Sequence, residues 1–201
     1  MNFEKLCKNL EDKGYKVSCF DTRETAADYI NSQINETTVG IGGSMTVLEM
    51  GLYEQLSLHN SVNWHWKLSE NETAPEIIKK ARTSEIYISS VNGISEDGEI
   101  INIDGNCNRV AEIFYGHKKV YLIVGKNKVA KDFNAALFRA RNTAAPLNAK
   151  RLGAQTPCAK NGVKCYDCKS SGRICRGLSV LWNKPSTGDF EIILIDENLG
   201  Y

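Results

Sequence analysis

The chain has 201 residues, of which 42% are apolar and 24% charged, and its formal net charge is +1. This length and apolar content predict a globular protein that fits one domain better than two. No segment approaches the roughly 18 apolar residues of a membrane helix, and residues 1–17 lack the apolar run of a signal peptide, so we expect a cytoplasmic protein without a membrane span.

The small net charge hides a strong asymmetry along the chain. Residues 1–116 carry a net charge of −8, residues 117–176 carry +12 and residues 177–201 carry −3. A basic block of this size suggests an anionic partner, such as a phosphate, a carboxylate, a nucleotide or RNA. The alternative is a basic surface that is simply solvated.

Apolar periodicity predicts helices and strands in alternation. The N-terminal part, residues 1–36, reads as helix, strand and helix. A strand over 37–41 follows and runs into glycines, and after it come a helix over 44–56, a strand over 61–66 and a helix over 72–84. Residues 85–104 read as two β segments around an Asp97-Gly98 turn. The remaining predicted elements are a helix over 108–116, a buried strand over 118–125, a helix over 128–142 and a buried strand over 190–196.

This order predicts an α/β fold with a mostly parallel central sheet flanked by helices, to which the β-hairpin adds an antiparallel element. We expect one domain over residues 1–201, with a cysteine-rich insertion at 152–180. Irregular segments of this length inside a compact domain are usually functional or disordered, and a bound metal would be one way to order this one.

The segment VGIGGSMTVLE is a strand, a glycine turn and a helix start, which is a local geometry that holds anions. Gly42 and Gly43 would let a ligand approach the backbone, while Ser44 and Thr46 would add hydroxyl donors. Glu49 is the acid nearest this loop and a candidate base or nucleophile. The alternative is a tight turn capped by Ser44, with Glu49 on the helix surface.

Other loops that follow predicted strands offer further donors. Asn108 and Arg109 follow the DGN turn, and Arg109 could hold a carboxylate bidentately. Lys128 could reach an anion from the loop after residue 125. The alternatives are a surface ion pair for Arg109 and solvation for Lys128.

Two more segments contribute weaker candidates. The run APLNAKRL supplies Asn148, Lys150 and Arg151, either as ligand donors or as a solvated basic loop. His65 stands between two tryptophans on the predicted strand over 61–66, where a half-buried strand residue is the simpler interpretation than a catalytic base.

Four cysteines, Cys158, Cys165, Cys168 and Cys175, have the spacing C-x6-C-x2-C-x6-C. The central C-x-x-C pair suits chelation, and four thiolates fit zinc or an iron-sulfur cluster. A reversible disulfide and unliganded thiols are the alternatives, and nearby lysines and arginines would favour thiolates in any of these cases.

These motifs together resemble the lactate utilization (LUD) domain family. The resemblance covers roughly residues 37–176 and rests on VGIGGSMTVLEMGL, SVNGISEDGEIINIDGNCNRVAEIFYGHKKVYLIVGKNKV, RARNTAAPLNAKRL and TPCAKNGVKCYDCKSSGRIC. It implies a fold related to the ribose-5-phosphate isomerase, glucosamine-phosphate deaminase and CoA-transferase superfamily, whose glycine loops bind phosphate or CoA-type ligands.

The resemblance also implies redox-linked, lactate-type organic-acid utilization alongside iron-sulfur partner proteins, and it favours a [4Fe-4S] cluster over zinc at the four cysteines. The chain looks like the smaller, stand-alone, lactate utilization protein C-like type, since it lacks the ferredoxin run C-x-x-C-x-x-C-x-x-x-C-P. We therefore expect a small anionic ligand of carboxylate, phosphate or CoA type. The alternatives are a transferase or isomerase with a structural zinc, and a non-enzymatic ligand sensor or RNA-binding module, with nucleic acid the less favoured partner.

Overall fold

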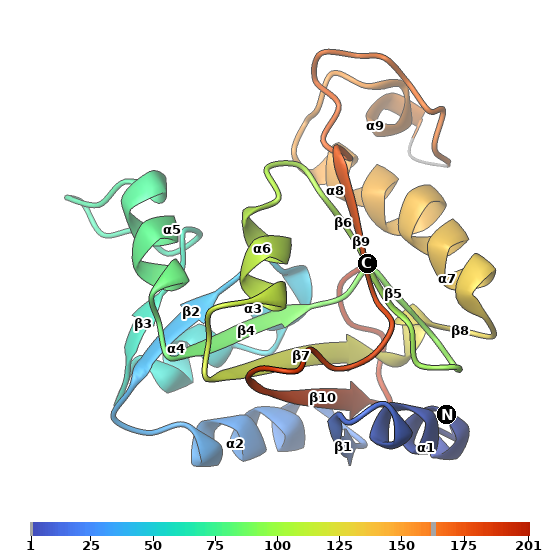
Figure 1. Cartoon of the computed structure of the whole chain (residues 1–201). Helices are drawn as coiled ribbons and strands as arrows, with labels where there is room; N and C mark the ends of the chain where they lie inside the picture. Colours follow the sequence, from blue (N-terminus) through green and yellow to red (C-terminus); the bar gives the residue numbers. More distant parts are fainter. Residues whose placement is uncertain (1, 162–163) are drawn as a thin grey trace.

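Two sheets organise the fold, seen in the computed structural model, which describes residues 2–161 and 164–201 (Figure 1). The larger sheet is parallel throughout and has the strand order β1-β10-β7-β4-β2-β3. Its strands are β1 (Lys16–Phe20), β10 (Asp189–Ile195), β7 (Lys119–Gly125), β4 (Ile86–Ser90), β2 (Thr38–Ile41) and β3 (Ser61–Asn63). The predicted α/β class with a parallel central sheet is confirmed.

The smaller sheet is mixed and has the order β8-β5-β6-β9. Its strands are β8 (Val129–Ala130), β5 (Gly93–Ser95), β6 (Ile100–Asp104) and β9 (Gly177–Leu181). The hairpin predicted at Asp97-Gly98 joins β5 to β6, and Gly98 has the positive φ of +89° that this turn favours. The first predicted β segment divides, however, because β4 joins the parallel sheet before the chain reaches β5.

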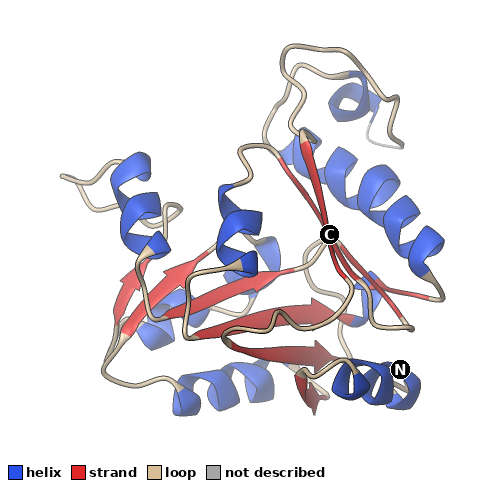
Figure 2. Ribbon diagram, in the orientation of Figure 1, coloured by secondary structure: helices blue, strands red, loops and turns tan. Residues whose placement is uncertain are grey.

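Helices cover both faces of the parallel sheet (Figure 2). One face packs against α2 (Arg23–Gln33), α3 (Met45–Glu49) and α4 (Leu52–Leu56), and the other against α1 (Glu4–Asp12), α6 (Asn108–Phe114) and the smaller sheet. α5 (Ala74–Arg82) contacts β2 and β3. No helix within the described residues combines the length and apolar character needed to cross a membrane.

The predicted buried strands have a continuous apolar sequence because both faces of the parallel sheet are covered. In β7, Tyr121 and Ile123 belong to the core beside α2, whereas Val120 and Leu122 belong to the core beside α1 and α6. Successive side chains of a strand point to opposite faces, so both sets must be apolar.

Three predicted elements have different bounds in the structure: one helix is broken, one strand ends earlier and one helix begins later. The helix over 44–56 divides into α3 and α4 at Gly51, whose φ is +64°. The strand over 61–66 stops at Asn63, so the Trp-His-Trp run lies in the loop after β3. Lys128 ends a short 3-10 turn, η1 (Lys126–Lys128), that precedes the predicted helix.

That last helix continues beyond its predicted end. It comprises α7 (Phe133–Arg139), a π-helical turn η2 (Ala140–Ala144) and α8 (Ala145–Arg151), which packs beside α9 (Pro157–Asn161). Pro146 lacks an N–H and its ring would clash with the carbonyl four residues earlier, so the wider π turn accommodates it. APLNAKR is therefore helical and not a loop.

A charged cluster lies inside the parallel sheet on β10. The fully buried Glu191 carboxylate is 2.8 Å from Lys119 Nζ and accepts hydrogen bonds from Tyr29 and Ser18. Burial alone would raise the pKa of Glu191, but these donors, led by Lys119, bring it below the ordinary value of 4.5.

We expect Glu191→Gln to lower the free energy of unfolding by about 1–3 kcal/mol at neutral pH, because hydrogen bonds to a charged group are lost. A carboxyl whose pKa is depressed in the folded state stabilises it above the unfolded pKa, and this contribution disappears as pH falls through the folded pKa. Urea unfolding at several pH values measures this. The wild-type and variant curves should converge below pH 4.5, and a gap that stays constant would contradict the role given to Glu191.

Candidate functional site

The loops that carry the predicted site residues meet at one edge of the parallel sheet. Because all six strands run the same way, the segments that follow β2, β3, β4, β7 and β10 emerge together at their carboxyl ends. From β2 the chain moves outward to β3, whereas from β4 it moves the opposite way to β7. The boundary between the neighbouring strands β2 and β4 is thus the topological switch point, and ligands of open α/β sheets bind at the carboxyl ends of the strands at such a point.

A cavity of about 710 Å³ lies at this edge. Its walls come from the glycine loop, the loops after β3, β4, β6 and β7, helix α8 and residues 171–176. Of the predicted ligand residues, the structure brings six together here: Gly43, Ser44, Thr46, Asn108, Arg109 and Lys128. Gly42 is not among the lining residues.

The two glycines serve close packing. A Cβ on Gly42 would lie 2.8 Å from the Tyr87 hydroxyl and 3.0 Å from Arg109 Cγ, and one on Gly43 would lie 3.2 Å from the Trp66 ring. Ser44 caps α3 by accepting a hydrogen bond from Val47 N. Since α3 has only five residues, the positive charge around the cavity comes from side-chain cations more than from a helix dipole.

Arg109 has no donor left for a bidentate contact with a ligand. Its two terminal nitrogens donate four hydrogen bonds, at 2.7 to 3.0 Å, to Ser90 O, Asn102 Oδ1, Asn92 Oδ1 and Ile103 O. Its Nε lies 3.5 Å from the Asp104 carboxylate. Arg109 is therefore a positioning residue, and the expectation that it holds a carboxylate is corrected on this geometry.

Arg151 is the better placed guanidinium. It lies over the Trp66 ring, 4.7 Å from the centroid, and Trp66 in turn stacks on the buried Trp64 at 5.4 Å. Its Nε and one terminal nitrogen both donate hydrogen bonds to Asn148 Oδ1, one turn back in α8. The π turn before α8 sets the rotation of α8 about its axis, and with this rotation the side chains of Asn148 and Arg151 line the cavity.

The lining of the cavity is strongly basic. Four arginines and a lysine contribute to it against a single carboxylate, that of Asp104, which pairs with Arg109. Within the described residues, no carboxylate lies at ion-pair distance from Arg151 or Arg176. The basic block of residues 117–176 thus turns part of its charge inward, toward a space where an anion would be bound.

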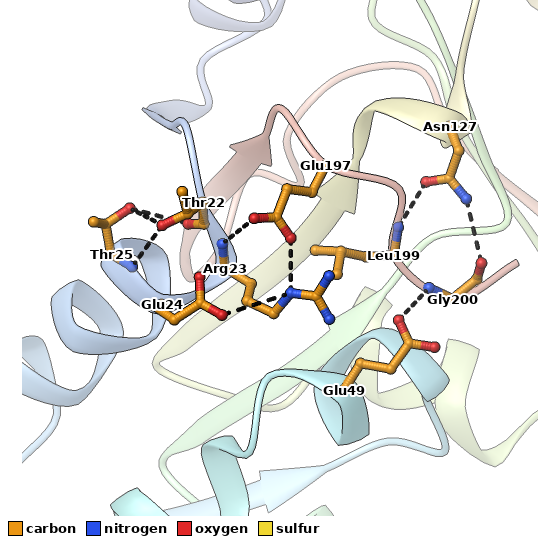
Figure 3. Close-up of polar contacts among 9 residues, drawn as sticks. All are labelled: Thr22, Arg23, Glu24, Thr25, Glu49, Asn127, Glu197, Leu199 and Gly200. Carbon is orange, nitrogen blue, oxygen red and sulfur yellow. Dashed lines mark hydrogen bonds and ion pairs between the residues drawn. The ribbon is translucent and has the colours of Figure 1, made fainter.

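Glu49 lies outside this lining. Its carboxylate accepts a hydrogen bond of 2.9 Å from Gly200 N in the chain that follows β10 (Figure 3). Asn127 holds the same segment, accepting from Leu199 N and donating to Gly200 O. Glu49 thus anchors the segment after β10, and the prediction that it acts as a base in the pocket finds no support in its placement.

Four lining residues were not predicted as ligand-binding residues, namely His65, Trp66, Ser90 and Asn92. His65 and Trp66 line the cavity because β3 stops at Asn63, and burial lowers the pKa of His65. Ser90 is the last residue of β4, and Asn92 lies in the loop that follows it. The rule that ligands bind at the carboxyl ends of parallel strands could have selected all four residues, since each lies at or just after the end of a strand.

The cysteine segment contributes one wall. Cys175 lines the cavity beside Arg173, whose guanidinium donates to the carbonyls of Cys175 and Cys168. Hydrogen bonds from Ser170 lower the pKa of the Cys168 thiol, which favours its thiolate.

The thiols themselves are not assembled into a metal site. Among residues 2–161 and 164–201, no three His, Cys, Asp or Glu side chains lie close enough to share an ion, so this arrangement does not fit a cluster or a zinc. The two sulfur atoms of Cys7 and Cys19, far along the chain from this segment, lie 3.1 Å apart.

The family model for the LUD domain matches residues 3–195, nearly the whole chain. The chain belongs to the LUD domain family. The match extends the resemblance beyond residues 37–176 to include the N-terminal unit and β10. Among curated proteins, none matches this LUD-domain sequence.

One solved structure shows the same fold as this LUD-domain protein. A DUF162 family protein from Deinococcus radiodurans superposes with a TM-score of 0.51 at 10% identity, over 97% of this chain and 99% of that one. At this identity the likeness concerns the fold alone. Two Chaetomium thermophilum structures match more weakly: eIF2B beta (TM-score 0.35, 13% identity, 56% of this chain and 44% of that one) and eIF2B delta (0.37, 12%, 66% and 54%).

Removing the Arg109 guanidinium should cost stability, whereas removing that of Arg151 should not. We expect Arg109→Gln to lower the free energy of unfolding of the LUD-domain protein by about 3–5 kcal/mol, because Asp104 and several buried oxygens lose their donors. The exposed Arg151→Gln is the matched control and should change it by less than about 1 kcal/mol. Denaturant unfolding measures both, and equal losses would contradict the division of roles.

Proposed function

We propose that this LUD-domain protein binds a small organic anion in the cavity at the carboxyl ends of β2 and β4. The observation that carries the proposal is the charge of the lining, in which four guanidinium groups accompany one side-chain carboxylate, that of Asp104, which is already paired with Arg109. Carboxylate, phosphate and CoA-type groups are the anions that such a lining suits, since guanidinium groups bind both carboxylates and phosphates.

Within that class, we propose redox-linked utilization of a lactate-type organic acid in the cytoplasm, in the manner of a stand-alone, lactate utilization protein C-like member that works with iron-sulfur partner proteins. Membership of the LUD family supports this assignment, as does the position of Cys175 in the cavity wall. The alternative of a transferase that uses Glu49 has less support, because that carboxylate is bonded to Gly200 N.

The iron-sulfur cluster, or zinc as its alternative, stays a prediction. Four thiolates are a chemically suitable donor set, and the pKa of Cys168 is lowered. Binding would require residues 158–175 to bring the sulfur atoms together in an arrangement different from the one described. No chemical step is therefore assigned to a metal here.

Anion binding is tested by titrating the protein with lactate, inorganic phosphate and CoA, with isothermal calorimetry as the measurement. We expect at least one of them to bind, with an affinity that falls as salt rises because the contacts are ionic. Arg151→Gln should weaken that binding about tenfold, the usual cost of a charge-assisted hydrogen bond.

Lys131→Gln is the control for this titration. Lys131 is a basic residue of the same block, but it is exposed, pairs with Asp132 at 3.7 Å and does not line the cavity. Its variant should bind like the wild type. If none of the anions binds, or if both variants lose affinity equally, the proposed site is wrong.

The cysteine prediction has its own measurement, which is iron, zinc and sulfide analysis of protein purified without oxygen. We expect iron and sulfide, with a visible absorption band that is lost in Cys165→Ser and Cys168→Ser. Cys107→Ser, outside the four-cysteine spacing, should keep it. Protein that contains neither iron nor zinc would rule out the metal assignment and leave anion binding unaffected.

A further inference from the structure

Lys128 is a buried amine that anion binding alone does not explain. It ends η1 after β7, and only 3% of its surface is exposed, yet it lines the cavity. Its Nζ lies 2.7 Å from Thr46 Oγ1 and 2.7 Å from Ser90 Oγ. These two hydroxyls hold the amine at the switch point between β2 and β4.

The hydrogens of both hydroxyls are used elsewhere. Ser90 Oγ lies 2.6 Å from Ile123 O, closer than its 3.3 Å to Thr46 Oγ1, and Thr46 Oγ1 donates to Leu199 O. Both oxygens can therefore only accept from Nζ. Two N–H groups of Lys128 are thereby satisfied, which is the full donor count of a neutral amine and leaves its lone pair free.

The charges around Lys128 oppose a protonated amine. Burial lowers the pKa of Lys128 well below its ordinary value, and the neighbouring guanidinium groups of Arg139 and Arg109 lower it further, whereas the Glu49 carboxylate raises it by a smaller amount. Among the described residues no carboxylate lies at ion-pair distance from Nζ. A desolvated lysine next to other cations is the setting in which an amine acts as a nucleophile.

We propose that Lys128 is a catalytic nucleophile that forms an imine with a carbonyl-bearing organic anion. The Nζ lone pair attacks the carbonyl carbon and a carbinolamine forms. Loss of one water, which takes the carbonyl oxygen and the two amine hydrogens, then leaves a C=N bond to Lys128. The step needs no oxidant or reductant.

This inference rests on the proposed anion site and narrows its ligand class. Arg151 and the rest of the basic lining would hold the anionic group, while the ligand carbonyl meets Lys128. A cavity of about 710 Å³ accommodates either a short oxo acid or an open-chain sugar phosphate. Both have the same chemistry, a carbonyl together with an anionic group.

Reductive trapping tests the proposal. The full chain is incubated with cyanoborohydride and, in separate arms, with pyruvate, 2-oxoglutarate or dihydroxyacetone phosphate, and adducts are located by intact mass and peptide mapping. We expect one adduct per chain, on Lys128, formed either with the oxo acids or with dihydroxyacetone phosphate. An anion that binds the cavity but has no carbonyl group, such as lactate or inorganic phosphate, should compete and reduce the yield of this adduct. The arm that reacts identifies the ligand class.

The adduct should disappear in Lys128→Arg and Lys128→Met. It should persist in Lys126→Arg, which changes a half-buried lysine of the same turn that pairs with Asp196. The competition measured on the wild type does not depend on whether the Lys128 variants fold. If anions bind in calorimetry but no adduct forms on Lys128, or if adducts spread over exposed lysines without competition, the nucleophile is wrong and the anion site stands. Absence of both binding and adduct overturns both.

Discussion

The buried guanidinium of Arg109 is the interaction on which the rest of the site depends. Its bonds to Ser90 O and Asn92 reach the end of β4 and the loop that follows, and those to Asn102 and Ile103 O reach β6 in the other sheet. A buried charge without partners would be costly, so the two sheets must meet where these acceptors converge. The cavity is the space left above that junction, and Gly42 is what allows the glycine loop to approach it.

The cationic side chains around this junction, Arg109, Arg151 and Lys128, differ in their burial and in their hydrogen-bond partners. Arg109 uses its terminal nitrogens on oxygens of the protein, whereas Arg151 lies over Trp66 in the cavity lining and donates to Asn148 Oδ1. Lys128 donates to the hydroxyls of Thr46 and Ser90, and the charges that act on it are mainly those of Arg139 and Arg109. The cations of the cavity thus differ in their surroundings: the guanidinium of Arg109 is buried and fully bonded, Arg151 is exposed beside Trp66, and Lys128 is buried among hydroxyls.

Much of the fold could be predicted from sequence, because apolar periodicity and the runs of β7 and β10 report local burial directly. The convergence of the glycine loop and Lys128 also followed, since β2 and β7 are parallel strands that end at a common edge, whereas Asn108 reaches this edge from β6 of the smaller sheet. What could not be predicted depends on contacts between distant segments. The partners of Arg109 come from two sheets, and Glu49 turns to Gly200, which is 151 residues away along the chain. β9 was hidden inside the predicted insertion because its pairing with β6 is not a local property.

The π turn at Ala140–Ala144 sets the angular phase of everything after it. Each residue of a helix advances its neighbours by about 100°, so one residue more or fewer in this turn rotates the whole of α8 about its axis. A relative that keeps Asn148 and Arg151 in its sequence but lacks the π turn would point them away from the cavity. Ligand preference within the family would then change with no change in any of the residues that contact the ligand.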